Sequence, residues 1–398
     1  MVEATVPMKP CPSCTATGAS VFFRVASTPV TCTSIFDTPQ QARAVACGPV
    51  DLAVCPRCGL IFNVSFDAER AEIGARYESS QSASMHFTEF ARGLADTWVT
   101  RHALAGGSVL EIGCGQCDFL RLLLQRGVAR GLGLDPLAPA DPQPPLAGLQ
   151  VQQHLFDAST FDLDADAAVC RHTLEHVQDV HVFLRTLARW ATRDRKRVVL
   201  FELPATERLL SERAFWDVYY EHCNYFSADS LKYAFEVSGL QVLRCEAAYG
   251  DQYLLLEARA ADAAAARTLP DVSDLQARCI EFGRDVAIAV ARCDARLAAM
   301  AGGTGPVVLW QGAAKTVGFL AALQCDGLVH SAVDLNPQRH GRFLPGSGLP
   351  VVSPQALLQI RPSQVVLMNP VYRSEVQALL TQLGVTANLT TVVDLCSP

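Results

Sequence analysis

Two pairs of cysteines near the N-terminus have the spacing of metal ligands. Cys11 and Cys14 enclose Pro-Ser, and Cys55 and Cys58 enclose Pro-Arg. The C-x-x-C spacing lets both sulfurs of a pair reach one Zn²⁺ ion, and two such pairs complete a tetrahedral site. All four ligands would come from the protein, so no position stays open for water. The spacing therefore predicts a structural zinc site, with chance pairing in a cysteine-rich segment as the alternative.

A second group of residues could hold a ligand that contains a ribose. Glu111, Gly113 and Gly115 lie in the run Glu-Ile-Gly-Cys-Gly, between an apolar stretch and a helical pattern. Glycines let the backbone turn sharply and approach a ligand closely. Asp135 ends the next apolar stretch, where a carboxylate can accept hydrogen bonds from ribose hydroxyls. Taken alone, such a turn would also fit a nicotinamide-dependent dehydrogenase.

Aromatic and ionisable side chains are concentrated between Phe215 and Ser227, directly before a helical pattern. Aromatic faces can stack on a sugar or a base, and a histidine such as His222 can move a proton near neutral pH. The segment therefore favours an acceptor site with acid–base chemistry. The alternative is a buried aromatic turn in which Glu221 and His222 pair only with each other.

The apolar pattern predicts the elements that position these residues. Short buried strands are expected at Ser108–Ile112, Gly131–Leu134, Ala167–Cys170 and Arg197–Glu202, and helices at Asp118–Gln125 and Val180–Trp190. This alternation predicts a parallel, doubly wound sheet. Two further runs, Leu240–Cys245 and Tyr253–Glu257, are joined by a short turn and should form an antiparallel hairpin at its edge.

A second, smaller α/β unit is expected after a long helical pattern at Asp274–Met300. Its first elements are a strand at Val307–Trp310, a helix at Thr316–Leu323 and a strand at Leu328–Val333. The chain of 398 residues is also too long for one ordinary domain. We expect a zinc-binding module at 1–65, a ligand-binding domain at 66–260, a helical linker at 261–303 and a Rossmann-like domain at 304–398.

These motifs, and their order, resemble a known family. The run from Glu111 to Gly115 resembles the first motif of class I S-adenosylmethionine (SAM)-dependent methyltransferases, and Arg-His-Thr-Leu-Glu-His from Arg171 resembles their segment after the fourth strand. Tyr219–Phe226 resembles the Y-x-E-H-x-x-Y-F signature of the sugar C-methyltransferases of deoxysugar pathways. That family combines a zinc module, a class I Rossmann-like SAM domain and a second Rossmann-like domain. The order of motifs in this chain resembles that arrangement over its whole length.

The resemblance implies contacts with the cofactor SAM. Glu111, Gly113 and Gly115 would line its methionine end, Asp135 would hold the ribose, Asp157 would lie near the adenine, and His172 would belong to the same site. His172 and His176 could instead be buried, hydrogen-bonded core residues, and this is the interpretation we favour for His176.

The resemblance also implies an acceptor, a 4-keto sugar carried on a nucleotide, whose ketone acidifies the neighbouring C–H bond. His222 would remove that proton and Glu221 would orient the imidazole. Tyr219 or Tyr220 would donate a hydrogen bond to the enolate oxygen, and Asn224 could hold the same ketone.

Three departures from the family pattern leave other functions open. Tyr220 stands where the signature often has a histidine, Cys117 replaces a motif glycine, and Gln311 replaces a glycine in the C-terminal run that begins at Trp310. The cysteine at position 117 is energetically costly only if the backbone there needs a positive φ. The alternatives are an O- or N-methyltransferase acting on another small-molecule natural product, a SAM- or zinc-binding scaffold without catalysis, and a zinc-knuckle RNA methyltransferase.

Composition restricts the partners. The net charge of −7 and the lack of a dense Lys/Arg block disfavour nucleic acid as a partner. The start of the chain lacks the layout of a signal peptide, and no apolar run approaches the length of a membrane span, so we expect a cytoplasmic protein with no membrane partner. In that compartment the fifteen cysteines should stay reduced, and Cys32 and Cys47 are possible substitutes in the zinc site. The sequence does not indicate an oligomeric state.

Overall fold

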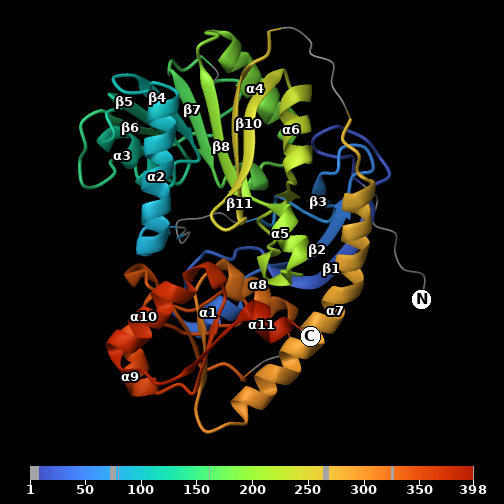
Figure 1. Ribbon diagram of the computed structural model, residues 1–398, viewed down its shortest axis with the longest axis vertical. Coiled ribbons are helices and arrows are strands. Elements are labelled where there is room, and N and C mark those ends of the chain that lie inside the picture. Colours follow the sequence, from blue (N-terminus) through green and yellow to red (C-terminus); the bar gives the residue numbers. More distant parts are fainter. Residues whose placement is uncertain are drawn as a thin grey trace.

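Three β-sheets organise the protein (Figure 1). The computed structural model describes residues 9–71, 78, 80–160, 162–262, 269–323 and 327–397. Residues 263–268 of the expected linker lie outside the described residues. Along the chain, the N-terminal sheet comes first, the central sheet second and the C-terminal sheet last.

The central sheet has seven strands in the order β10-β11-β8-β7-β4-β5-β6. Its strands are β4 (Ser108–Ile112), β5 (Arg130–Leu134), β6 (Leu149–Gln152), β7 (Ala167–Arg171), β8 (Val198–Pro204), β10 (Leu240–Ala248) and β11 (Tyr253–Ala260). Five strands, β6, β5, β4, β7 and β8, run parallel to one another, and β11 is antiparallel to both β8 and β10. The predicted doubly wound sheet with an antiparallel hairpin at its edge is therefore confirmed.

Helices cover both faces of the central sheet because its strands are apolar on both sides. Val169 and Leu200 pack on the face covered by α2 (Met85–Arg101) and α3 (Asp118–Gln125). The opposite face packs against α4 (Val180–Thr192) and α6 (Ala228–Val237). This central domain places the ends of β4, β5 and β7 at one edge, where a doubly wound sheet binds its ligands.

The N-terminal sheet is antiparallel and contains a strand from a distant part of the chain. Its order is β1 (Ser20–Pro29), β2 (Cys47–Val54), β3 (Ile61–Asn63) and β9 (Asn224–Tyr225). In β9, Tyr225 pairs with Ile61 and Asn224 with Phe62. The segment that the sequence marks as the acceptor site is therefore built into the sheet of the expected zinc module.

The C-terminal sheet is parallel and forms a second α/β unit. Its strands, in sheet order, are β14 (Val351–Val352), β13 (Ser331–Val333), β12 (Val307–Trp310), β15 (Gln364–Leu367) and β16 (Asn388–Thr391). Its helices are α8 (Ala314–Ala322), α9 (Leu357–Ile360), α10 (Arg373–Leu383) and α11 (Val392–Cys396). The long helix α7 (Ser273–Ala301) runs beside the N-terminal sheet to this C-terminal unit (Figure 1).

The N-terminal sheet and the C-terminal unit also contact each other directly. Phe36 forms a β-bridge with Phe343, and Gly346 donates a backbone hydrogen bond to Ala42 of α1 (Pro39–Arg43). The helix α8 packs against β1 and against the turn at Phe215–Asp217, which follows α5 (Thr206–Ser211). The helix α8 thus places the C-terminal unit against both the N-terminal sheet and the segment Phe215–Asp217.

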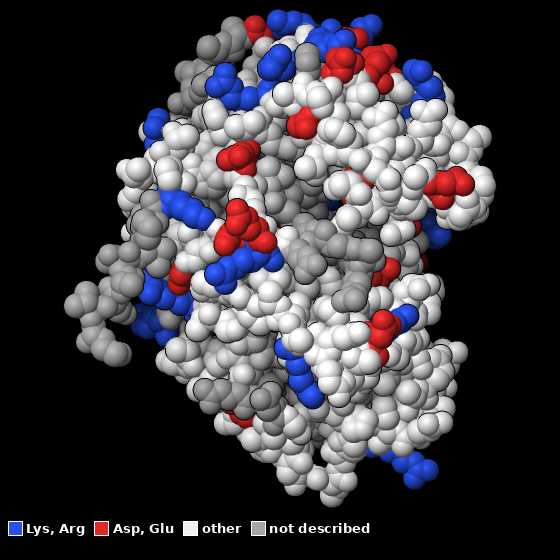
Figure 2. All heavy atoms as spheres, turned by 180° about the vertical axis from the view of Figure 1, so that it is seen from behind, with Lys and Arg blue, Asp and Glu red and all other residues white. Residues whose placement is uncertain are grey.

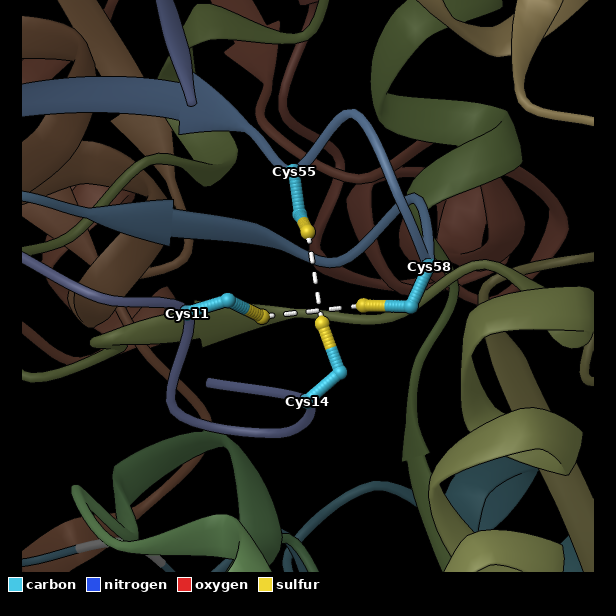
Figure 3. Close-up of side chains that lie close together, drawn as sticks. All are labelled: Cys11, Cys14, Cys55 and Cys58. Atoms are coloured by element: carbon cyan, nitrogen blue, oxygen red, sulfur yellow. Dashed lines mark hydrogen bonds between the residues drawn. The ribbon is translucent and has the colours of Figure 1, made fainter. Parts of the chain in front are cut away.

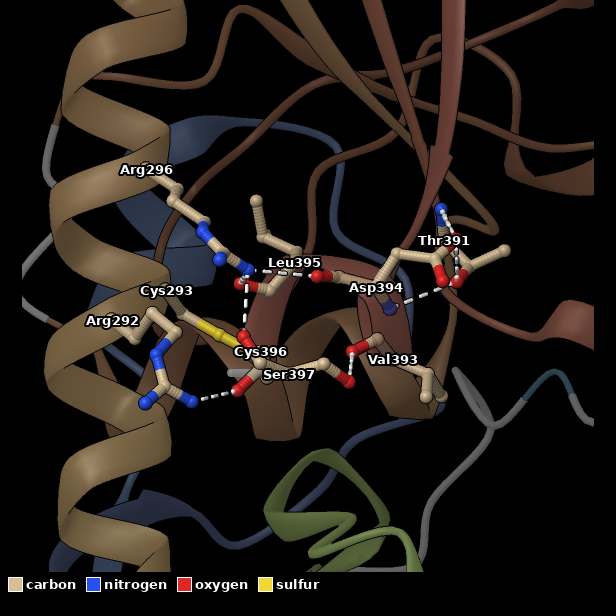
Figure 4. Close-up of a disulfide and its surroundings, with 9 residues drawn as sticks. All are labelled: Arg292, Cys293, Arg296, Thr391, Val393, Asp394, Leu395, Cys396 and Ser397. Atoms are coloured by element: carbon tan, nitrogen blue, oxygen red, sulfur yellow. Dashed lines mark hydrogen bonds between the residues drawn. A yellow bond between two sulfur atoms is a disulfide. The ribbon is translucent and has the colours of Figure 1, made fainter.

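A disulfide joins Cys293 of the long helix α7 to Cys396 of the last helix, α11 (Figure 4). Around it, Arg292 donates to the Cys396 carbonyl oxygen, and Arg296 donates to the carbonyl oxygens of Asp394, Leu395 and Ser397. Such donors satisfy the carbonyl groups that the end of a helix leaves unpaired. The expectation of only reduced cysteines was wrong, because partners 103 residues apart in apolar surroundings carry no spacing signal.

The surface of the described residues carries charges of both signs. On the face shown in Figure 2, basic and acidic side chains are interspersed and separated by uncharged surface. Several charged side chains among the described residues form ion pairs near the surface, such as Arg213 with Asp285. Among the described residues, no helix has both the length and the apolar character that crossing a bilayer requires.

Candidate active site

A cavity of about 1090 Å³ lies where the carboxyl ends of β4, β5 and β7 face the other two sheets. Its walls come from the turns after these strands, from the segment between Asp217 and Tyr225, and from the turns after β12 and β13 of the C-terminal unit. Pockets for a single small ligand are commonly about 300–1,000 Å³, so this cavity has room for a cofactor and a second molecule.

The glycine-rich turn after β4 is shaped to admit a ligand. Gly113 has a φ of +72°, and a Cβ atom there would lie 2.1 Å from the hydroxyl oxygen of Thr173. Gly115 has a φ of +50°, and its N–H donates to the Asp135 carboxylate over 3.0 Å. The other carboxylate oxygen of Asp135 accepts from the backbone N–H of Leu137. Asp135 thus fixes the turn while it remains in the cavity wall.

Glu111 is buried at the base of this turn and faces the cavity. One of its carboxylate oxygens has no hydrogen-bond partner among the described residues. Burial raises the pKa of Glu111 to about 8, although the nearby Arg171 guanidinium opposes this shift. A buried carboxyl with an unpaired oxygen is suited to accept a hydrogen bond from a ligand, so the residues present fit SAM.

Cys117, which replaces a motif glycine, lies directly before α3 with a φ of +63°. This is the left-handed region of backbone conformation, which residues other than glycine rarely adopt. The backbone of this turn therefore does require a positive φ, and the cysteine occupies it at a cost of about 1–2 kcal/mol. Its side chain is fully buried, and its thiol lies 3.7 Å from the Cys114 sulfur.

Asp157 and His172 also lie in the cavity wall. The Asp157 carboxylate accepts hydrogen bonds from the N–H and hydroxyl of Ser159, and these lower its pKa. Burial alone would lower the pKa of His172, but its contacts with Glu175 and Glu202 outweigh burial and raise this pKa to about 9. His172 is thus held as a cation between two carboxylates.

His222 lies in the same wall, among other rings. Its ring centroid is 4.8 Å from that of His176 and 4.8 Å from that of Tyr219. Burial lowers the pKa of His222 to about 3, and the neighbouring His176 contributes to this shift. The imidazole is therefore neutral at physiological pH. The same shift makes it a weaker base than an exposed histidine, so a bound ligand has to stabilise the imidazolium if His222 is to take a proton.

Glu221 does not orient His222, so the expected contact between them was wrong. Its buried carboxylate accepts hydrogen bonds from the backbone N–H and the thiol of Cys32, in the loop after β1. Cys32 is brought next to Glu221 from the N-terminal sheet and occupies one carboxylate oxygen, while the other is buried without a hydrogen-bond partner among the described residues. Sequence adjacency could not reveal that competing partner.

Tyr220 is also not a donor to the acceptor site. It is fully buried against Phe66, and its hydroxyl exchanges hydrogen bonds with the backbone of Asp67. Tyr219 does line the cavity, but its hydroxyl already donates to Asp217 over 2.7 Å. Of the two tyrosines, only Tyr219 is close to the proposed chemistry.

Asn224 lies in the cavity wall with its amide nitrogen already engaged. That nitrogen donates to the Val177 carbonyl oxygen over 2.7 Å and contacts the Cys223 sulfur. Its amide oxygen is buried and has no partner among the described residues. Asn224 is therefore arranged to accept a hydrogen bond from a hydroxyl, whereas holding a ketone would need a donor.

Sequence analysis missed Lys315, which the C-terminal unit contributes to the cavity. Its ammonium group pairs with Asp217, the carboxylate that also binds Tyr219. Burial lowers the pKa of Lys315, while Asp217 opposes this shift. A signal was present in the sequence, since Lys315 ends the run that begins at Trp310 and resembles a turn of the family's C-terminal domain. Only the fold, however, brings Lys315 next to Asp217 and Tyr219.

The four predicted zinc ligands lie together at the edge of the N-terminal sheet. The sulfurs of Cys11, Cys14, Cys55 and Cys58 point toward one another (Figure 3) and all lie within 4.8 Å of each other. The shortest sulfur–sulfur distances are 3.5 and 3.6 Å. Sulfurs around a tetrahedral Zn²⁺ are about 3.8 Å apart, so this donor set fits the ion. Cys32 is bound to Glu221 and Cys47 is exposed, so neither substitutes for a ligand.

Comparisons with known proteins agree with this architecture. A methyltransferase domain family matches residues 87–244, and the C-methyltransferase C-terminal domain family matches residues 273–388. The chain is a SAM-dependent methyltransferase that combines a methyltransferase domain with a C-methyltransferase C-terminal domain. This methyltransferase is 26% identical over 355 residues to the C-methyltransferase NovU of Streptomyces niveus, and the match covers 82% of each chain.

Solved structures of other proteins are similar to part of this enzyme. The 1,6-didemethyltoxoflavin N1-methyltransferase of Burkholderia thailandensis is 17% identical, with a TM-score of 0.35, over 44% of this chain and 80% of its own. The PH0226 protein of Pyrococcus horikoshii is 13% identical, with a TM-score of 0.36, over 46% of this chain and 94% of its own.

Proposed function

We propose that this methyltransferase transfers the methyl group of SAM to a carbon atom of a nucleotide-linked 4-ketodeoxysugar, through an enolate. The observation that carries the proposal is His222, a neutral imidazole in the wall of a cavity with room for two ligands. A carbon acid needs a base to form a nucleophile, whereas a hydroxyl or amine acceptor can react once it is positioned.

The residues around His222 supply the other parts of this chemistry. SAM supplies an electrophilic methyl group when it is bound. His222 takes the proton from the carbon next to the ketone. Lys315 is the donor best placed for the enolate oxygen, because the Tyr219 hydroxyl is engaged with Asp217 while an ammonium group has three protons to donate. Asn224 accepts a hydrogen bond from a sugar hydroxyl.

The cofactors divide between two parts of the chain. Glu111 at the end of β4, with Gly113 and Gly115 in the turn after it, binds the methionine end of SAM. Asp135, after β5, binds the ribose, and Asp157, after β6, lies near the adenine. A Zn²⁺ ion held by the four N-terminal cysteines stabilises the module at 1–65. The domain at 66–260 binds SAM, the linker at 261–303 connects it to the rest, and the unit at 304–398 closes the acceptor side.

The test separates deprotonation from methyl transfer. His222→Gln should bind SAM normally, and should lose methyl transfer to nucleotide-linked 4-ketosugars by a factor of about 10²–10⁴. It should equally lose exchange of the substrate C–H with deuterated solvent, followed by NMR without SAM. In the unaltered enzyme, this base should stay active from pH 8 down to pH 5, because its pKa of about 3 lies below that range.

Tyr220→Phe is the matched control, since that hydroxyl binds the backbone of Asp67. It should keep both activities. If His222→Gln stays folded and keeps solvent exchange, His222 is not the base. If no ketosugar exchanges or accepts methyl while another small molecule does, the enzyme is an O- or N-methyltransferase.

A further inference from the structure

Glu175, His176 and His222 form a cluster in the cavity wall that the mechanism above does not fully use. Each offers one ligand atom, and the three atoms lie within 4.8 Å of one another. Glu175 and His176 belong to a 3₁₀-helix at Leu174–His176, directly after β7, and His222 comes from the segment before β9. Two rigid parts of the fold thus bring a carboxylate and two imidazoles together.

The carboxylate of Glu175 needs an explanation. Only 2% of Glu175 is exposed, and neither carboxylate oxygen has a hydrogen-bond partner among the described residues. The nearest cation is His172, whose Nδ1 lies 3.7 Å away, too far for a hydrogen bond. The ion pair with His172 therefore compensates part of the buried charge but leaves the carboxylate oxygens without donors, so the arrangement is suited to a second cation that arrives from the cavity.

The imidazole of His176 is held in a tautomer and orientation that suit a metal ligand. Its Nδ1 donates to the Glu221 carbonyl oxygen over 3.0 Å, which fixes the tautomer and leaves the lone pair on Nε2. Metal-binding histidines commonly donate their other ring nitrogen in this way. The ring of His222 lies beside it, with its centroid 4.8 Å from that of His176.

We propose that Glu175, His176 and His222 bind a divalent transition-metal cation of the Zn²⁺ class, and that this cation inhibits methyl transfer. Two histidines and a glutamate, with a fourth position open to a cavity, are a ligand set that zinc accepts. Ligand atoms around tetrahedral Zn²⁺ are about 3.3 Å apart, so the three side chains need to close in by at most about 1.5 Å. This site is separate from the four-cysteine cluster.

Inhibition follows from competition for one lone pair. A metal ion on His222 occupies the nitrogen that would accept the substrate proton. This consequence rests on the proposed role of His222 as base, whereas metal binding itself does not. The binding assay and the activity assay can therefore fail independently.

The test uses Co²⁺, whose visible absorption reports its ligands, on full-length enzyme with the cysteine site already filled by zinc. We expect one further equivalent of Co²⁺ to bind, and Zn²⁺ to displace it. Glu175→Gln and His176→Gln should each weaken this binding by at least about tenfold. His330→Gln is the control, because that ring lies in the C-terminal unit beside Ser331 and should leave Co²⁺ binding unchanged.

Zinc content at the cysteine site and SAM affinity measured by calorimetry show whether each variant is folded. A folded Glu175→Gln variant that binds the further Co²⁺ as tightly as the unaltered enzyme would overturn the site, as would the absence of any further equivalent.

The effect on the reaction is measured in parallel. Added Zn²⁺ should suppress solvent exchange of the substrate C–H, a chelator should restore it without removing the cysteine-bound zinc, and SAM affinity should not change. If Co²⁺ binds as expected but exchange continues at full rate, the metal site stands, while the inhibition and the role of His222 as base are both overturned.

Discussion

Gln311 has a backbone conformation that is unfavourable for a glutamine. It follows β12 with a φ of +107°, in a region that only glycine adopts without strain, and its side-chain oxygen is buried without a partner among the described residues. Gln311→Gly should therefore raise the free energy of unfolding by about 1–2 kcal/mol, measured by urea denaturation. Gln311→Ala is the control, because it removes the same side chain but keeps the strain. Equal stability of the two variants would show that φ is not the cause.

Glu111 makes SAM binding sensitive to pH. In the free enzyme its pKa is about 8, so the carboxyl is largely protonated at pH 7. SAM carries a net positive charge, which favours the ionised carboxylate and lowers this pKa on binding. Binding at pH 7 should therefore release up to one proton, and SAM affinity should rise with pH up to about 8. Calorimetry in two buffers of different ionisation enthalpy measures that proton.

Glu111→Gln is the matched control for this proton release. It keeps the shape of the side chain but cannot ionise, so its SAM affinity should not depend on pH in this range. Release of the same proton by the variant would assign the effect to another group.

The local residue pattern marked several residues that lie in the cavity wall and misled for others. Gly113, Gly115 and Asp135 form the tight turn beside the cavity, where backbone geometry restricts which residues can occupy each position, and their contacts with SAM stay a prediction. Glu221 and Tyr220 were misassigned, because their partners, Cys32 and Asp67, come from other parts of the chain. The role of a buried polar side chain depends on tertiary contacts that spacing does not encode.

At the scale of the elements, we expect the folding of the N-terminal sheet to depend on zinc binding by the four cysteines. Cys55 and Cys58 lie in the turn between β2 and β3, and β3 pairs with β9. Cys58→Ser should lose zinc, as measured by elemental analysis, and should lose hydrogen-exchange protection in β2 and β3 because metal binding and folding are linked. Methyl transfer should fall with it, since Asn224 lies in β9, while SAM binding should persist.

Cys47→Ser provides the comparison for that variant. Cys47 is exposed and lies outside the cluster, so this substitution should leave zinc, protection and activity unchanged. Full zinc retention in Cys58→Ser would contradict the four-cysteine site.

Elements with a strong local pattern were predicted closely. β4 and α3 begin and end where the sequence places them, and α7 differs by one residue at each end. The short strand β6 was missed, because its alternation of half-buried and exposed residues gives little hydrophobic signal. The two-residue strand β9 exists only through its pairing with β3, so no local pattern could predict it.

At the scale of the whole molecule, the C-terminal unit is attached to the central domain beside the cavity. Glu375 of α10 accepts hydrogen bonds from the hydroxyl of Ser84 and the backbone N–H of Met85, at the start of α2. Gln252 and Asn369 exchange two amide hydrogen bonds nearby. These contacts hold the two walls of the cavity together.

Loss of the Glu375 carboxylate should loosen this attachment. Glu375→Ala removes two acceptor contacts and a negative charge at the start of a helix, so the free energy of unfolding should fall by about 1–2 kcal/mol. Hydrogen exchange at the first turn of α2 should speed up. Gln377→Ala, an exposed position on the same helix, should change stability by less than about 0.5 kcal/mol. Equal effects of the two variants would refute the proposed role of Glu375.

The position of β9 in the N-terminal sheet has a consequence for biosynthesis. On the ribosome, β1, β2 and β3 are made long before residue 225, so the edge of β3 waits for its partner for roughly ten to thirty seconds at ordinary elongation rates. An unpaired strand edge is a site for aggregation. Early zinc capture by the nascent chain would keep the first strands folded during this interval, so the yield of native enzyme in cells should depend on the zinc supply during translation.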